Sequence, residues 1–125
     1  MPLLQFATTL SLSPAQRESF VAFVTDRYTE EMETTAGHVA VTVTEHEPSA
    51  MAIGRGVEGP LLFLDAEIRE GRPFEYKRAF ALAVMERAVE AFDVPEPNCK
   101  VVFTEHAGED MMGIDRVGGG WTDGE

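Results

Sequence analysis

The sequence predicts an α+β fold in which one β-α-β unit occurs twice. Two helical stretches alternate with strand-like stretches, and short motifs recur later in the chain in the same order. The recurring anchor points are Pro2 and Pro60, Ser13 and Arg72, and Val41 and Val101. Their separations are 58, 59 and 60 residues, a drift small enough to indicate duplication with minor loop insertions.

We expect a single domain with a first half at residues 1–57, a second half at 58–117 and a Gly-rich tail at 118–125. The end of the tail, residues 122–125, is expected to be disordered. A crossover helix makes the two strands of each half parallel and lies on one face of them. The two halves then form a four-stranded mixed sheet with both helices on one face, a monomer with a pseudo-twofold axis.

The first half contains the expected elements in the order strand, helix, strand. Residues 3–6 are apolar apart from one glutamine and predict the first strand. Residues 13–33 predict a helix, because Ser13 and Gln16 stand at the spacing of a capping box. Alternating valines over residues 39–44 predict the second strand.

The second half repeats this order after residues 50–53, which are expected to form a short strand or a turn. Residues 62–68 alternate as a strand, and residues 101–106 predict the last strand. Between them a helix is expected to start at Arg72-Pro73. Its predicted apolar face consists of Phe74, Phe80, Ala81, Val84, Met85, Ala88 and Phe92.

The sheet face without helices is expected to carry Leu61, Phe63, Val102 and Leu4, which are too apolar for water. Association with further copies of the chain would cover that face. We predict a closed ring of subunits, with a trimer preferred.

Composition restricts the classes of function. The net charge of −12 argues against binding to nucleic acid or to anionic membranes. No apolar run reaches the ~20 residues of a membrane span, so a cytoplasmic protein is expected. Cys99 is the only cysteine, and His46 and His106 look like polar residues at strand ends. Neither a metal nor a cofactor is expected.

Pro2 is the first candidate catalytic residue. Methionine is normally removed before proline, which would leave a free secondary amine at the start of a strand. An α-amino group titrates near ~8, and burial or nearby cations lower that pKa toward the range of a useful base. The alternative is that proline stands here only because it is permitted.

Arg69 and Arg72 lie three residues apart across the turn that leads into the second helix. Two guanidinium groups beside a helix start suit a carboxylate ligand. The alternative is that both arginines solvate the turn and pair with Glu70 or Glu75.

The Pro2 amine, the duplicated unit and the arginine pair together resemble the tautomerase superfamily. That superfamily includes 4-oxalocrotonate tautomerase, malonate semialdehyde decarboxylase, macrophage migration inhibitory factor and cis-3-chloroacrylic acid dehalogenase. Residues 2–6 resemble the decarboxylase, residues 12–14, 25–26 and 69–72 the dehalogenase, and residues 51–54 the migration-inhibitory branch. The resemblance implies a homotrimer with an active site near each Pro2, lined partly by the adjacent subunit.

The resemblance also implies roles for single residues. Pro2 matches the catalytic amine, and Arg69 and Arg72 match the pair that holds the substrate carboxylate. Tyr28 stands where the dehalogenase branch has a substrate-binding histidine, although a core tyrosine on the helix face is an equal alternative. Ile68 and Phe103 are further possible site residues.

Other positions depart from the family pattern. The dehalogenase's water-activating glutamate falls near Gly113 and its tyrosine near Val102, so Asp115 could substitute only if its loop bends differently. The decarboxylase's aspartate falls near His38, which is either an acid–base group or a strand-start histidine without a role. Met111, Met112 or Ile114 either wall the pocket or pack against a neighbouring subunit.

These residues predict a tautomerase acting on a small 2-oxo or enol carboxylic acid. The alternatives are a hydratase, dehalogenase or decarboxylase with the same site, or a trimeric binding module without catalysis. The choice depends on the proton at Pro2: if Asp65 or Glu67 faces it, the amine stays protonated and acts as an acid.

Overall fold

The computed structural model describes residues 1–121 of the chain. Residues 122–125, for which disorder was expected, lie outside the described part. Within residues 1–121, no helix combines the length and apolar character that crossing a membrane requires.

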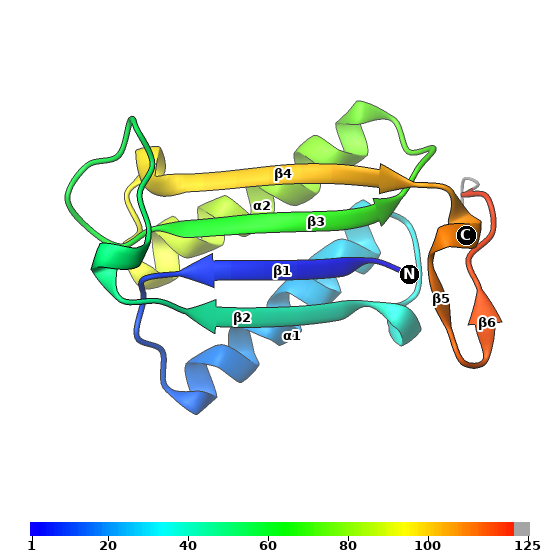
Figure 1. Cartoon of the computed structure of the whole chain (residues 1–125), viewed down its shortest axis with the longest axis horizontal. Helices are drawn as coiled ribbons and strands as arrows, with labels where there is room; N and C mark the ends of the chain where they lie inside the picture. Colours follow the sequence, from blue (N-terminus) through cyan, green and yellow to red (C-terminus); the bar gives the residue numbers. More distant parts are fainter. Residues whose placement is uncertain (122–125) are drawn as a thin grey trace.

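A four-stranded mixed sheet covered on one face by two helices forms the molecule (Figure 1). The strands are β1 (Leu3–Thr8), β2 (Ala40–Glu45), β3 (Leu62–Arg69) and β4 (Cys99–His106), and the helices are α1 (Pro14–Glu31) and α2 (Phe74–Phe92). The order is β2-β1-β3-β4, with parallel pairs within each half and an antiparallel pair, β1 and β3, between the halves. The predicted fold class is therefore confirmed.

The two helices begin differently, although an X-Pro pair stands at the start of each. Ser13 and Gln16 form the predicted capping box. The Ser13 hydroxyl accepts a hydrogen bond from the backbone N–H of Gln16 at 3.1 Å, and Gln16 Oε1 accepts one from the backbone N–H of Ser13 at 2.8 Å. Pro14 is the first residue of α1. In α2, by contrast, Pro73 is itself the cap and provides no side-chain hydrogen bond.

The core lies between the sheet and the helices. The even-numbered apolar residues of β3 and of β1 face the helices, and aromatic rings from both layers meet edge to face. The ring centroids of Phe6 and Phe20 lie 4.9 Å apart, and those of Tyr28 and Phe80 lie 5.1 Å apart. Such pairs stabilise a core beyond the area they bury.

Two predictions about the faces are wrong. Leu4 is fully buried under the helices, because strand alternation places it on the side of Phe6 and leaves Leu3 on the bare face. Phe74 is 66% exposed, whereas Tyr76 is partly packed against the core and the buried residues of α2 begin at Phe80. The bare face is mixed: Leu3, Phe63 and Val102 lie there among polar residues.

Residues 50–53 form no strand. The connection between the halves instead holds a 3-10 turn, η2 (Pro48–Ala50), followed by irregular chain. Asn98, in the 3-10 turn η3 (Glu96–Asn98) before β4, is fully buried and fixes this connection. Its Oδ1 accepts a hydrogen bond from the backbone N–H of Val57 at 2.8 Å. Its Nδ2 donates hydrogen bonds to the carbonyls of Val57 at 2.8 Å and Pro60 at 3.0 Å.

Replacing Asn98 with alanine should lower the free energy of unfolding by about 3 kcal/mol, because several backbone groups of the connection lose their partner at once. Denaturant unfolding measures this change. Glu96→Ala, an exposed position in the same turn, is the control and should change stability little. Equal stability of both variants would show that water replaces the amide without cost.

Candidate active site

Pro2 immediately precedes β1, one of the two central strands of the sheet. Pro2 is buried, and its carbonyl accepts a hydrogen bond from the Ala40 amide at 3.1 Å. A short hairpin, β5 (Met112–Gly113) and β6 (Arg116–Val117), lies beside this N-terminal end (Figure 1). Two 3-10 turns, η1 (Ala36–His38) and η4 (Gly108–Asp110), also contribute residues here. Together with the hairpin they line the cavities around Pro2.

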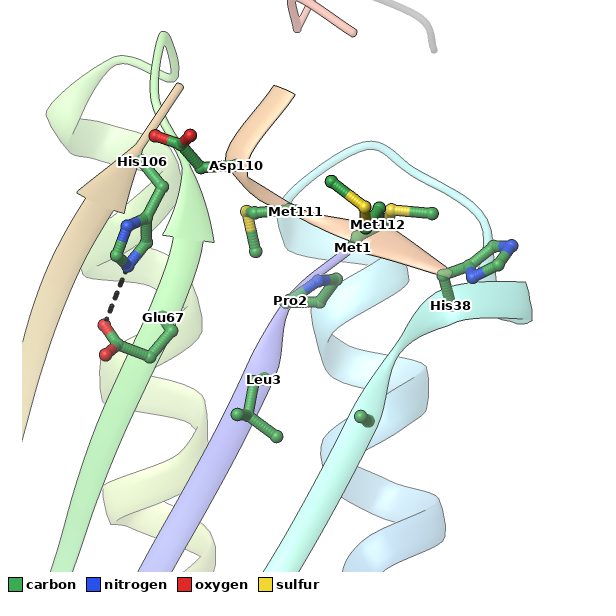
Figure 2. A pocket seen from close by; sticks show the side chains of 10 residues that line it. Met1, Pro2, Leu3, His38, Glu67, His106, Asp110, Met111 and Met112 are labelled. Atoms are coloured by element: carbon green, nitrogen blue, oxygen red, sulfur yellow. Dashed lines mark hydrogen bonds and ion pairs between the residues drawn. The ribbon is translucent and has the colours of Figure 1, made fainter. Parts of the chain in front are cut away.

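Two cavities meet at Pro2, and Met1, Pro2 and His38 line both of them. The acidic cavity, of about 440 Å³, is lined by Glu67, His106, Asp110, Met111 and Met112 in addition. The cationic cavity, of about 180 Å³, is lined by Thr34, Thr35, Arg69 and Arg116 in addition. Figure 2 shows the acidic cavity, with Pro2 between the Glu67–His106 pair on one side and His38 on the other.

Arg69 lies where the sequence analysis expects it, beside Pro2. Its side chain is only 5% exposed, lines the cationic cavity and donates from Nη1 to the Gly119 carbonyl at 3.0 Å. The second cation of this cavity is Arg116, from the hairpin. Sequence reasoning missed Arg116, because nothing along the chain indicates that the hairpin folds back over the N-terminus.

Arg72 does not line either cavity, which corrects the predicted pairing with Arg69. Its Nε donates to the Met32 carbonyl at 2.8 Å, and its guanidinium carbon lies 5.8 Å from the Tyr28 ring centre and 5.3 Å from that of Trp121. The preceding Gly71 has a φ of +116°, which turns the chain sharply between the two arginines. Arg72 therefore joins the end of α1 to the C-terminal segment.

Three other predicted site residues belong to the core. Tyr28 is 1% exposed and Ile68 is fully buried, and Phe103 packs partly buried against the same cluster. None of the three lines the acidic or the cationic cavity, because alternation directs Ile68 and Phe103 toward the helices. For Tyr28 the structure favours the core role over contact with a substrate.

His38 and Asp115 are brought together by the bend of the hairpin. His38 Nε2 lies 3.7 Å from Asp115 Oδ2. A Cβ on Gly113 would lie 3.1 Å from Asp115 Oδ1 and 3.2 Å from His38 Cε1, so a glutamate at this position would displace the pair. Asp115 itself is exposed and does not line either cavity.

The three apolar residues that the sequence analysis placed either at the pocket or at a neighbouring subunit have different positions. Met111 and Met112 wall the acidic cavity, in agreement with one of the two interpretations of this segment. Ile114, at the tip of the hairpin, is fully exposed and provides no wall.

Of the two carboxylates that the sequence named as able to face Pro2, Glu67 lines the acidic cavity and Asp65 does not, and Glu67 pairs with His106, a pairing that the sequence did not indicate. Glu67 Oε2 and His106 Nε2 are 3.2 Å apart, and both side chains line the acidic cavity. Alternation alone places Glu67 on the bare face, but its partner lies on a strand that becomes its neighbour only in the folded sheet. Among residues 1–121, no three His, Cys, Asp or Glu side chains are grouped as metal ligands.

No protein-family model matches the chain, and no curated protein matches it. Solved structures do. One is N1, a member of the cis-3-chloroacrylic acid dehalogenase family, with a TM-score of 0.83, 16% identity, and coverage of 94% of this chain and 84% of that one. Another is the FG41 malonate semialdehyde decarboxylase inhibited by 3-bromopropiolate, with a TM-score of 0.74, 23% identity, and coverage of 88% and 87%.

A third is W0, a fused 4-OT described as a symmetric trimer, with a TM-score of 0.76, 21% identity, and coverage of 86% of this chain and 88% of that one. These neighbours are members of the tautomerase superfamily, and the chain has their fold. The fold that the sequence resemblance implied is thereby confirmed.

Burial raises the pKa of Tyr28 to about 12, from an ordinary value of 10.0. Because the folded state holds the phenol proton more tightly, this contribution to stability is complete below pH 10 and is lost between pH 10 and about 12. The free energy of unfolding should therefore fall over that range, and phenolate absorbance should show a step near its upper end. Tyr28→Phe should remove the step; its persistence in the variant would contradict the assignment.

Proposed function

We propose that this chain is a cofactor-independent enzyme of the tautomerase superfamily, with the amine of Pro2 as its general acid–base. The substrate would be a small 2-oxo or enol carboxylic acid, and the reaction a keto–enol or 1,3-allylic tautomerisation. The observation that supports this most is the position of Pro2, buried at the meeting point of a cationic and an acidic cavity.

The proposal requires removal of Met1. While Met1 is attached, the Pro2 nitrogen is an amide without a basic lone pair. Met1 also lines both cavities, so its removal would open space next to the nitrogen as well as free the amine.

The substrate carboxylate would bind in the cationic cavity. Arg69 and Arg116 provide guanidinium groups, and Thr34 and Thr35 line the same cavity. Guanidinium groups favour carboxylates through charge-assisted, bidentate hydrogen bonds. This assignment replaces Arg72 of the family resemblance by Arg116, since Arg116 lines the cationic cavity and Arg72 lines neither cavity.

In the proposed reaction the neutral Pro2 nitrogen takes a proton from the carbon next to the 2-oxo group and returns it to the oxygen or to a more distant carbon. Under this proposal the two guanidinium groups would oppose a second positive charge beside them and so favour the neutral amine. Proton transfer by a positioned group typically contributes ~10²–10⁴-fold to the rate.

A second candidate reaction is hydration of a small unsaturated acid, and the location of Glu67 supports it. Glu67 lines the same cavity as Pro2, and a nearby carboxylate would favour the ammonium form of the amine. The amine would then act as an acid toward a substrate carbon.

We also propose a homotrimer. W0, which shares the fold, is described as a symmetric trimer, and the bare face of this chain exposes Leu3 and Val102 to 38% and 47%. Association would remove these apolar side chains from water.

Pro2→Ala should reduce kcat/KM for tautomerisation of phenylpyruvate or 2-hydroxymuconate by about 100-fold or more, because the rigid secondary amine is lost. Spectrophotometric assays measure this, and the intact mass of each protein establishes whether Met1 is absent. Pro14→Ala, at the start of α1, is the matched control. Undiminished turnover by Pro2→Ala would exclude the amine from the mechanism.

Arg69→Gln and Arg116→Gln should each raise KM for the carboxylate substrate by about tenfold or more, with a smaller change in kcat, because each removes a charge-assisted bond to the bound acid. Arg17→Gln disrupts a surface ion pair with Glu45 and serves as the control. An unchanged KM in Arg116→Gln would show that Arg116 does not bind the substrate carboxylate.

A further inference from the structure

We propose that the outer side of α2 carries a second ligand site, which binds a small amphipathic cation: an ammonium group attached to an apolar aliphatic or aromatic body. The site is a groove of about 470 Å³ between α2 and the segment from η3 to the start of β4, and we call it the α2 groove. The proposal concerns binding alone, so it is independent of Pro2 and goes beyond the proposed function.

The α2 groove lies away from the candidate active site. Cys99, the first residue of β4, lines it and is the register partner of Leu62, which in turn pairs with Thr8 at the end of β1. Pro2 precedes the opposite end of β1. Figure 1 shows the same separation, with the start of β4, in yellow, and the N-terminus at opposite ends of the sheet. Among residues 1–121, none lines both the α2 groove and a cavity at Pro2.

One wall of the groove is an apolar stripe on α2. Its members are Leu82, Met85 and Val89, which stand three and four residues apart and therefore lie on one side of the helix. All three are half-buried, in contrast to the neighbouring stripe around Phe80 and Val84, which is fully buried in the core. A surface helix typically buries one apolar stripe against its own domain. The second stripe therefore leaves apolar surface that the fold itself does not cover.

The duplicated fold does not require this stripe. The helices correspond with an offset of 60 residues, as the buried pair Phe20 and Phe80 shows. At that offset the equivalents of the stripe in α1 are Ala22, Thr25 and Thr29. The two threonine hydroxyls donate hydrogen bonds to carbonyls of their own helix, at 2.9 Å and 2.8 Å. The first half thus folds in the same way with small and polar residues, and the apolar stripe is particular to the second half.

The rest of the groove is acidic. Glu86 and Glu90 line it from α2 and Glu96 from η3, and all three are exposed. No lysine, arginine or histidine of residues 1–121 lines the groove. Arg87, next to Glu86 on the helix, is directed toward α1, where its guanidinium carbon lies 4.6 Å from the Phe23 ring centre. A cleft lined by one sign of charge beside an apolar wall concentrates ligands of the opposite charge.

These two walls select the ligand. The apolar stripe offers a surface to an aliphatic or aromatic body, and the carboxylates accept charge-assisted hydrogen bonds from an ammonium group. The volume lies within the roughly 300–1,000 Å³ of small-molecule sites. A carboxylic acid is repelled here, so the groove takes the charge opposite to that proposed for the cationic cavity. A second copy of the chain, with its net charge of −12, is disfavoured as occupant for the same reason.

Cys99 makes occupancy of the groove measurable. It is the only cysteine of the chain, is half-buried and lines the groove. Burial first, and then the charge of Glu96, raise the pKa of its thiol. The thiol therefore reacts slowly but at one defined place. A ligand seated against the apolar stripe would cover the thiol and slow its modification further.

The test measures how fast N-ethylmaleimide, a neutral reagent, modifies Cys99 in the full chain at neutral pH. 2-Phenylethylammonium is the probe, and 3-phenylpropionate and 2-phenylethanol are its anionic and neutral counterparts. The cation should slow modification in a saturable manner by about fivefold or more, because it covers the thiol. At equal concentration the anion and the alcohol should change the rate by less than about twofold, because neither pairs with the carboxylates.

Two double variants test the acidic wall. Glu86→Gln with Glu90→Gln should weaken binding of 2-phenylethylammonium by about tenfold or more, because two charged acceptors are lost. The matched control makes the same kind of change at the equivalent places of α1, which are Asp26→Asn with Glu30→Gln. It should leave binding unchanged. Saturation of the protection of Cys99 gives the dissociation constant in each protein.

Met85→Thr with Val89→Thr tests the apolar wall by copying the first half of the chain. It should weaken binding by about tenfold, because the contact with the apolar body is lost. Both residues are half-buried, so circular dichroism checks the fold of this variant. If it does not fold, the exposed glutamate variants carry the test alone.

Three outcomes would overturn the proposal. The first is equal protection of Cys99 by the cation, the anion and the alcohol, or protection by none of them. The second is unchanged binding in the folded Glu86→Gln/Glu90→Gln or Met85→Thr/Val89→Thr protein. The third is a thiol that reacts only after light scattering shows dissociation of an assembly, which would mean that a second copy covers the groove. None of these outcomes bears on Pro2→Ala, so the proposed function is tested separately.

Discussion

The antiparallel pairing of β1 with β3 is the interaction on which the other features depend. It joins the two halves of the chain in the middle of the sheet and sets the register that pairs Leu3 with Glu67. A shift of one residue would reverse the faces of β1 and move Leu4 and Phe6 out of the core. The burial of the core and the composition of the site are thus two consequences of one register.

The C-terminal segment completes the site around this pairing. Arg69 donates a hydrogen bond to the Gly119 carbonyl, and Arg72 donates one to the Met32 carbonyl while its guanidinium group lies over the rings of Tyr28 and Trp121. Neither arginine is a free surface charge. The two side chains hold the segment that carries the hairpin close to the start of β1, and the hairpin in turn contributes Arg116 to the cationic cavity.

The separation of charge at Pro2 is unusual for a chain with a net charge of −12. The acidic excess lies mostly elsewhere, and the cationic cavity gathers Arg69 and Arg116 into a small volume where an anion is attracted despite the overall charge. On the other side of Pro2, Glu67 acts in the opposite sense on the amine. Under the proposed function, the balance between these groups would decide whether Pro2 takes a proton from a substrate or gives one to it.

The sequence by itself determined the four long strands, the two helices, the β-α-β repeat and the layer order, because strand alternation, the Ser13–Gln16 capping box and the recurring motifs are local patterns. It also indicated Pro2 and Arg69. Only the tertiary structure decided which other groups meet them: it moved Arg72, Ile68 and Phe103 away from the cavities and brought in Arg116 and the Glu67–His106 pair. The physical reason is that spacing along a chain predicts which face a side chain takes, whereas its neighbours depend on strand pairing and on the path of a returning hairpin.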